Sequence, residues 1–261
     1  MYSENIHIIS INNLSIGYRN RVLFSNLNFN ISEKDIVAII GLNGSGKSTL
    51  IRTICKLQKR IEGEILIKQK NINDYHSDEL SKIISVVLAG RGEVLQALTV
   101  QEILQIARSP YTGFMHRLQN EDNEIIEQTI EELQLKEFVN KKIYQLSDGE
   151  AQKVFIAKTL VQQTPIVFLD EPTSHLDIIN KIEIFKLIKQ LAKEKNKTIV
   201  FASHELELSL QIADKCLLLG KGGEFVFDTT SKLISSGVFE NFFASENYMF
   251  NKESKKFDIK L

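Results

Sequence analysis

The stretch IVAIIGLNGSGKSTLIRTI, from Ile36 to Ile54, decides which fold this sequence predicts. The apolar run that ends at Ile40 is typical of a buried strand, and a helical pattern begins near Gly46. The two are joined by G-x-x-x-x-G-K-S, the pattern of a loop that cradles phosphate groups. Because every fixed position is filled and the loop lies between a strand and a helix, a chance glycine-rich turn is the weaker interpretation.

The residue types in this loop fit the chemistry of a triphosphate. Glycines let several backbone N–H groups converge on one anion, and the start of a helix adds the positive end of its dipole. Lys47 supplies a charge for the terminal phosphates, and the Ser48 hydroxyl can ligate Mg²⁺. The sequence therefore predicts a nucleoside triphosphate bound by Gly41, Leu42, Asn43, Gly44, Ser45, Gly46, Lys47, Ser48 and Thr49.

The composition is that of an ordinary globular protein, with 43% hydrophobic and 25% charged residues. A net charge of −1 without a long Lys/Arg block argues against nucleic acid as a partner. No apolar run approaches the ~20 residues that a membrane-spanning helix needs. The N-terminal stretch MYSENIHIIS does not have the pattern of a signal peptide. Cys55 and Cys216 lack metal-ligand spacing, which favours reduced core residues. We expect a cytosolic chain that reaches the membrane only through a partner.

The rest of the chain indicates an α/β fold. Segments 6–18 and 22–31 alternate in the manner of antiparallel strands, and strands alternate with helices after Pro165, as in a mostly parallel sheet. Between them, residues 100–136 have helical spacing, whereas LAGRGEVLQALT before them reads as a loop. We expect one domain, 1–261, with an N-terminal antiparallel β-subdomain and an inserted helical subdomain at about 99–162. The tail, at about 230–261, carries aromatics that pack onto the domain or onto a second copy.

Two strand ends carry side chains suited to triphosphate hydrolysis. VFLDE ends an apolar strand at Asp170, which can hold the Mg²⁺ side of the site, and Glu171 follows as a base for the attacking water. His204 ends another strand and can contact the terminal phosphate or orient Glu171. Taken alone, an acidic pair or a histidine at a strand end is an ordinary solvated group. Downstream of a phosphate loop, the catalytic interpretation is favoured.

Five motifs occur in a fixed order: GLNGSGKST, LSDGE, VFLDE, TSHLD and ASH. Together they resemble the ATP-binding subunits of ABC transporters, over nearly the whole chain. The resemblance implies that the nucleotide is ATP, that Tyr18 stacks on adenine, and that Asp170 is the Walker B acid. It also implies that Glu171 is the catalytic glutamate and His204 the switch histidine, and that the D-loop, from Ser174 to Asp177, follows them.

The segment LSDGE resembles the family signature, which acts on the ATP of the opposing subunit. It opens a helix with a capping box between Ser147 and Glu150, so its tip is an anion-binding surface. The resemblance therefore implies a homodimer that buries two ATP molecules, each between Lys47 of one chain and the signature of the other. The signature residues are Ser147, Asp148, Gly149 and Glu150.

Two features narrow the branch of the family. The first is Glu150 at the end of the signature, and the second is the segment LTVQEILQIARSPYTG. Both resemble the corresponding features in the ATPases of importers for iron chelates, haem and vitamin B12. The resemblance implies a separate integral-membrane permease, an external substrate-binding protein, and a place for this chain on the inner face of the cell membrane. The transported molecule stays open, because selectivity in such systems lies in the other subunits.

The sequence departs from the family pattern at two positions. The family has a glutamine just after the segment that corresponds to IISVVL, but this sequence has Ala89 and Gly90 there. Asp148 stands where the family signature has a glycine. We hypothesise that Glu93, Gln96 or a water molecule takes the place of the missing amide. If transport-coupled turnover is unchanged in both Gln96→Ala and Glu93→Ala, the two side chains are excluded.

Other classes remain to be weighed. A non-transport ABC ATPase or an export ATPase would share the same nucleotide chemistry. A GTPase is disfavoured because Asn196-Lys197 is not followed by the x-D of a guanine-reading motif, and a small-molecule kinase needs neither LSDGE nor the Asp170-Glu171 pair.

Overall fold

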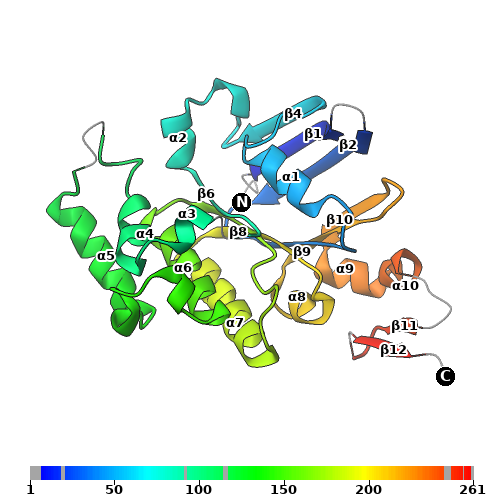
Figure 1. Cartoon of the computed structure of the whole chain (residues 1–261). Coiled ribbons are helices and arrows are strands. Elements are labelled where there is room, and N and C mark those ends of the chain that lie inside the picture. Colours follow the sequence, from blue (N-terminus) through cyan, green and yellow to red (C-terminus); the bar gives the residue numbers. More distant parts are fainter. Residues whose placement is uncertain are drawn as a thin grey trace, which may run out of the picture.

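The computed structural model describes residues 7–18, 21–90, 93–113, 117–243, 248–254 and 256–259. Two sheets are stacked in it with one helix between them, and most other helices lie beside or below the larger sheet (Figure 1). The smaller sheet is antiparallel, in the order β2-β1-β4-β5. Its strands are β1 His7–Tyr18, β2 Arg21–Ser32, β4 Glu62–Ile67 and β5 Lys70–Asn71.

The larger sheet has the order β10-β9-β3-β8-β7-β6. All its neighbouring strands run parallel except β10, which is antiparallel to β9. Helices cover such a sheet, so strands in its centre are apolar and buried along most of their length, as the fully buried β3 illustrates. The strands are β3 Ile36–Gly41, β6 Ile84–Val87, β7 Ile166–Asp170, β8 Thr198–Ser203, β9 Lys215–Leu219 and β10 Phe225–Thr229.

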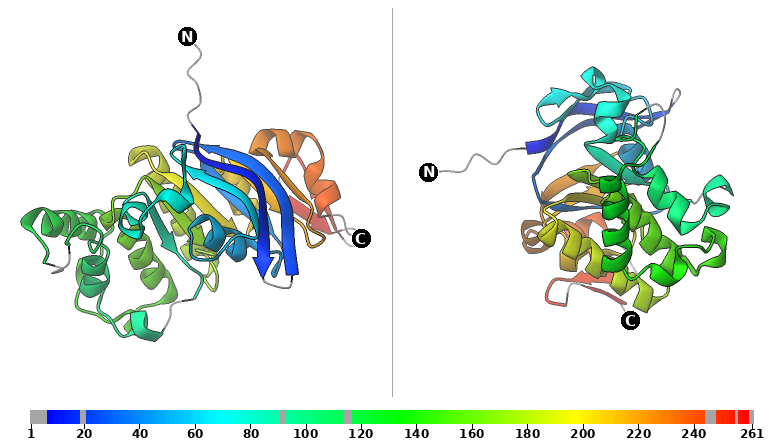
Figure 2. Two further views of the ribbon diagram at one scale, coloured as in Figure 1. Left: turned by 90° about the horizontal axis from the view of Figure 1, so that it is seen from above. Right: turned by 90° about the vertical axis from the view of Figure 1, so that its left-hand side faces the viewer.

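The helices divide into groups by position. Helix α1 lies between the two sheets, α4 to α6 form the flank drawn in green, and α7 to α9 lie below the larger sheet (Figures 1 and 2). The bounds are α1 Lys47–Ile54, α2 Ser77–Ser81, α3 Glu93–Gln96, α4 Val100–Ile106, α5 Asn120–Glu132, α6 Asp148–Val161, α7 Ile178–Glu194, α8 Leu206–Ile212, α9 Thr230–Ser235 and α10 Val238–Phe242.

Each face of the larger sheet carries its own core, and strand β3 contributes to both. Val37 and Ile39 pack toward α1 and the antiparallel sheet, whereas Ile36, Ala38 and Ile40 pack toward the helices on the other side. This is the α/β P-loop architecture that the phosphate loop and the apolar strands predicted, with a mostly parallel core sheet and an antiparallel N-terminal sheet. That fold prediction is confirmed.

One local expectation was wrong. The segment LAGRGEVLQALT is not a loop throughout, because residues Glu93–Gln96 form the short helix α3. Leu95 in α3 packs against the core on the helical side of the larger sheet, whereas Val94 and Gln96 on either side of it are exposed. A helical turn allows this one side chain to point inward. The sequence signal was too short to separate one turn from a loop.

The C-terminal segment packs onto the chain itself. Phe239 in α10 is fully buried, and its ring lies 5.0 Å from that of Phe250 in the hairpin formed by β11 Tyr248–Asn251 and β12 Lys256–Ile259. These two aromatics therefore pack onto the chain's own domain. The sequence had left open whether they pack there or onto a second copy.

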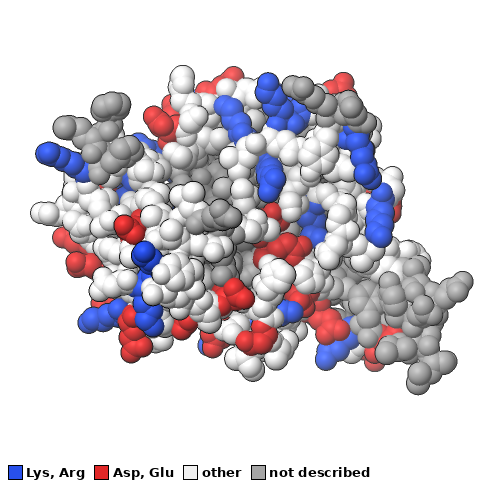
Figure 3. Space-filling view, in the orientation of Figure 1, with Lys and Arg blue, Asp and Glu red and all other residues white. Residues whose placement is uncertain are grey.

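The surface is mixed in charge. Basic and acidic side chains both occur across the face shown in Figure 3, in keeping with a net charge of −1. Over the residues that the structure describes, no helix is both long enough and apolar enough to cross a bilayer.

Candidate active site

The phosphate loop depends on glycine at its two ends. A Cβ on Gly41 would come within 2.5 Å of Ser45 Oγ and 2.6 Å of the Leu219 carbonyl oxygen, so only glycine fits there. Gly46 caps the start of α1 with φ at +100°, a backbone conformation that other residues rarely adopt. The loop therefore turns tightly from the end of β3 and directs the N-terminus of α1 at its own concave side.

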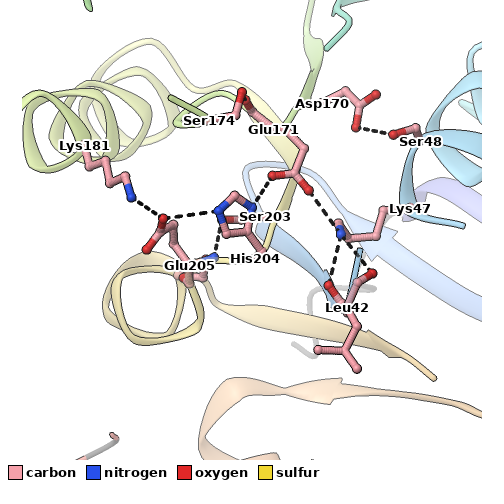
Figure 4. Close-up of polar contacts among 12 residues, drawn as sticks. Leu42, Lys47, Ser48, Asp170, Glu171, Ser174, Lys181, Ser203, His204 and Glu205 are labelled. Atoms are coloured by element: carbon pink, nitrogen blue, oxygen red, sulfur yellow. Dashed lines mark hydrogen bonds and ion pairs between the residues drawn. The ribbon is translucent and has the colours of Figure 1, made fainter. Parts of the chain in front are cut away.

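Lys47 is buried and is held by the loop that it follows. Its Nζ donates to the carbonyl oxygens of Gly41 at 2.9 Å and Leu42 at 3.3 Å, and lies 3.1 Å from Glu171 Oε1. The loop lysine and the acid after β7, 124 positions apart in the sequence (171 − 47), thus form an ion pair (Figure 4). This pair balances the lysine charge inside the site.

Ser48 and Asp170 form the second contact between α1 and β7. The Ser48 hydroxyl donates to Asp170 Oδ1 at 2.9 Å. Asp170 is the last residue of β7 and is 2% exposed, and its Oδ2 is buried with no hydrogen-bond partner among the described residues. Burial raises the pKa of this carboxyl, the hydrogen bond from Ser48 opposes the rise, and the charge of Glu171 adds to it. A hydroxyl and a carboxylate with a free oxygen are the ligands that Mg²⁺ prefers.

Glu171 and His204 meet where β7 and β8 end. His204 Nδ1 lies 2.6 Å from Glu171 Oε2, so the two side chains share a hydrogen bond. Glu171 has φ at +52°, which is uncommon for a residue other than glycine, and its backbone N–H donates to the Ala202 carbonyl on β8 at 3.1 Å. The strand end therefore turns to face the phosphate loop.

Two further side chains continue this arrangement beyond His204. Nε2 of His204 lies 3.4 Å from Glu205 Oε1, and Glu205 also pairs with Lys181 on α7. Sequence reasoning missed both. The only signal for Glu205 is that it directly follows His204, and nothing in the sequence brings Lys181 to the same place.

Because Asp170 is a buried carboxyl group, we expect its replacement by a neutral side chain to stabilise the folded protein. In nucleotide-free, metal-free protein, Asp170→Asn should raise the melting temperature by about 2–4 °C, because it removes a buried carboxylate that has one unpartnered oxygen. Calorimetry would measure it. The matched control is Asp122→Asn. Asp122 is also buried, but it pairs with Arg108 at 2.7 Å, so its replacement by asparagine should lower the melting temperature. A fall in both variants would contradict the expectation.

Tyr18 ends β1 beside the phosphate loop. Its hydroxyl lies 3.1 Å from Thr49 Oγ1 on α1, while the residue as a whole is 58% exposed. The phenol oxygen is therefore anchored, and the ring offers a flat apolar surface to solvent near the loop.

The signature residues lie at the tip of α6, where Asp148 lines the same cleft as Asp170 and Glu171. Ser147 Oγ accepts from the Glu150 backbone N–H at 3.3 Å, and the Ser147 N–H donates to Glu150 Oε2 at 2.7 Å, so the capping box is formed. These bonds lower the pKa of the Glu150 carboxyl. Asp177 caps α7 in a similar way, and the Ser174 hydroxyl donates to the Glu171 carbonyl oxygen at 3.1 Å.

A cleft of about 640 Å³ lies between the end of β6 and α6, and it reaches the acids of the site. Gly90 has φ at +87° and open space around its Cβ position, so the backbone conformation there disfavours a side chain even though room exists. Gln96 and Gln152 line the same cleft as Asp170 and Glu171. The side chain of Glu93 lies outside the described part of the structure. The hypothesis that Glu93, Gln96 or a water molecule replaces the missing glutamine therefore stays a prediction.

Comparison with known proteins places this geometry in a family. The ABC transporter family model matches residues 24–174. The chain is 32% identical to the iron(3+)-hydroxamate import ATP-binding protein FhuC of Bacillus subtilis, over 90% of this chain and 87% of that protein. It is similar to an inward-facing metal-chelate type ABC transporter, with a TM-score of 0.80, 28% identity and coverage of 97% and 95% of the two chains. A bacterial ABC transporter cassette solved as a dimer matches with a TM-score of 0.73 and 30% identity, over 85% of this chain and 98% of the other.

These matches confirm the class that the five motifs indicated. The chain belongs to the ABC transporter family. It is an ATPase of the ABC type, and ATP is its nucleotide.

Proposed function

We propose that this chain is the ATP-hydrolysing subunit of an importer for an iron complex or a related chelated cofactor. The similarity to FhuC and to a metal-chelate type transporter supports this assignment over an export or non-transport ATPase. The observation that carries the hydrolytic activity is the cluster formed by Lys47, Glu171 and His204, next to the Ser48–Asp170 contact.

Each residue of the cluster has a role that its position supports. The loop from Gly41 to Thr49 and the Lys47 amine bind the β- and γ-phosphates. Ser48 and Asp170 would hold Mg²⁺, which, when bound, neutralises charge on the phosphates. Glu171 accepts the proton of the attacking water, and His204 keeps its carboxylate oriented. Lys47 exchanges Glu171 for a phosphate when ATP binds, which leaves the carboxylate available as a base.

The exposed ring of Tyr18 would stack on adenine. Its hydroxyl is already fixed to Thr49, so the ring loses little freedom when the base binds. The hydrogen bond also ties the base-binding end of the site to the helix that follows the phosphate loop.

The signature acts in a second copy of the chain. The tip of α6, with Ser147 as its cap and Gly149 in its first turn, carries the positive end of the helix dipole, which suits a phosphate. A head-to-tail homodimer brings each tip to the other copy's phosphate loop, and the dimeric relative is consistent with such pairing. ATP then stabilises the closed pair, because only the closed pair contacts it from both sides.

The subunit would be a cytoplasmic protein bound to permease subunits at the inner face of the membrane, and indirectly served by a substrate-binding protein. The test is affinity purification of the tagged chain from membranes solubilised in detergent. An importer subunit should copurify with a polytopic permease in equal copy number. Recovery of an ATPase-active chain with ribosomal or assembly factors alone would favour the non-transport alternative.

A further inference from the structure

Both ring nitrogens of His204 face a carboxylate, and the outer carboxylate is held by a lysine from another helix. Nδ1 lies 2.6 Å from Glu171 Oε2, and Nε2 lies 3.4 Å from Glu205 Oε1. The same Glu205 oxygen pairs with the amine of Lys181, near the start of α7. The contacts therefore form one continuous chain, from Lys47 at the phosphate loop to Lys181 on α7 (Figure 4).

The backbone of Glu205 is fixed on both sides, which leaves its side chain little freedom. Its N–H accepts no other position than one that donates to Ser203 Oγ at 2.9 Å, and its carbonyl oxygen accepts from Ser209 Oγ at 2.6 Å. The side chains of Glu205 and Lys181 are only 22% and 21% exposed, so solvent screens their ion pair less than it screens a pair on the open surface. The oxygen that faces His204 is thus placed by α7 as well as by its own strand end.

Lys181 also closes a path that begins at Glu171. The chain leaves the site there, where the Ser174 hydroxyl donates to the Glu171 carbonyl oxygen at 3.1 Å. It returns to the site at Lys181, after the cap of α7. Both ends of this segment are therefore linked to His204, one directly and the other through Glu205. A displacement of α7 relative to β8 would be transmitted to the imidazole.

We propose that Lys181 and Glu205 are positioning residues, which hold the imidazole of His204 against Glu171. This inference rests on the proposed role of His204 in orienting the base. A ring that is held at one nitrogen can still swing about that contact, whereas a second contact at the opposite nitrogen fixes the ring plane. Neither residue belongs to the phosphate loop, so their effect is on turnover and not on the affinity for ATP.

The test compares steady-state ATP hydrolysis in three variants of α7. Lys181→Met should lower kcat by about three- to tenfold with KM for ATP unchanged, because the base is then less well oriented. Lys181→Arg keeps the charge and should retain most of the native kcat. The matched control is Lys195→Met. Lys195 caps the other end of α7 and pairs with Glu132 at 2.8 Å, so kcat should match that of the native chain.

A charge swap separates positioning of the histidine from a simple tie between two elements. The double variant Lys181→Glu/Glu205→Lys can form the ion pair in the reverse sense, but it presents an amine to His204 Nε2 in place of a carboxylate. We expect kcat to stay low. Full recovery of kcat would overturn the proposal, since the pair would then act only as a tie.

Nitrogen NMR of the imidazole gives a second measurement, which does not depend on turnover. The resonances of His204, assigned by their loss in His204→Ala, should shift in nucleotide-free Lys181→Met and stay in place in Lys195→Met. Unchanged resonances in Lys181→Met would contradict the proposal even if the swap variant failed to fold.

His204→Ala in the same hydrolysis assay separates this inference from the proposed function. If His204→Ala lowers kcat and Lys181→Met does not, the positioning role is wrong while the role of His204 stands. If His204→Ala hydrolyses ATP at the native rate, the proposed role of His204 is itself wrong, and the role of Lys181 and Glu205 fails with it.

Discussion

Glu171→Gln is expected to lower the steady-state rate of ATP hydrolysis by about 10²–10⁴-fold, the contribution usual for a general base. Glutamine has nearly the same shape but cannot take up a proton. It also removes the negative partner of Lys47, which lies 3.1 Å from the native carboxylate, so the lysine stays available to phosphate. ATP binding should therefore persist, and the closed dimer should accumulate because it is not hydrolysed.

A phosphate-release assay and an ATP-binding titration measure the two effects separately. Glu205→Gln is the matched control, since Glu205 contacts the other nitrogen of His204 at 3.4 Å but is not placed at the phosphate loop. Its effect on turnover should be far smaller. Hydrolysis at the native rate in Glu171→Gln would remove Glu171 from the role of base.

Ser147→Arg should abolish hydrolysis without weakening ATP binding to the monomer. Ser147 caps α6 at the tip that would contact the ATP of the other copy, and a long cationic side chain there obstructs close approach. Because the monomer's own phosphate loop is not altered, ATP affinity at low protein concentration should match that of the native chain. Gel filtration with ATP should show no dimer.

The loss of the helix cap itself must be separated from the loss of the interface. Thr99→Arg removes an equivalent capping box, in which Thr99 Oγ1 accepts from the Glu102 backbone N–H at 3.2 Å at the start of α4. Both substitutions should cost about 1 kcal/mol of stability. Only Ser147→Arg should stop ATP-dependent pairing. Normal turnover in Ser147→Arg would show that the site is not shared between copies.

The local parts of the site could be predicted because each is encoded by neighbouring residues. Gly41 to Thr49 form one continuous loop and helix start, and Asp170 and Glu171 follow one apolar strand. The capping box of Ser147 and Glu150 likewise needs only four consecutive residues. Hydrophobic period and fixed spacing are sufficient for features of this kind.

Other features depended on contacts that no local pattern encodes. The short helix α3 was missed because four residues carry too little periodicity. The partnership of Lys181 with Glu205 was missed because it joins a helix to a strand end. At Gly90, the backbone conformation near the missing glutamine became visible only in three dimensions.

The sequence by itself determined the class of protein, since the phosphate loop, the paired acids and the strand pattern are properties of short segments. The tertiary structure decided which distant side chains meet, such as Glu171 with both Lys47 and His204. It also decided which apolar side chains stay uncovered: on α7, Ile178 is exposed whereas Ile188 is buried. The physical reason is that hydrogen bonds and burial depend on distances of a few ångströms. Those distances are set only when the sheets and helices pack together.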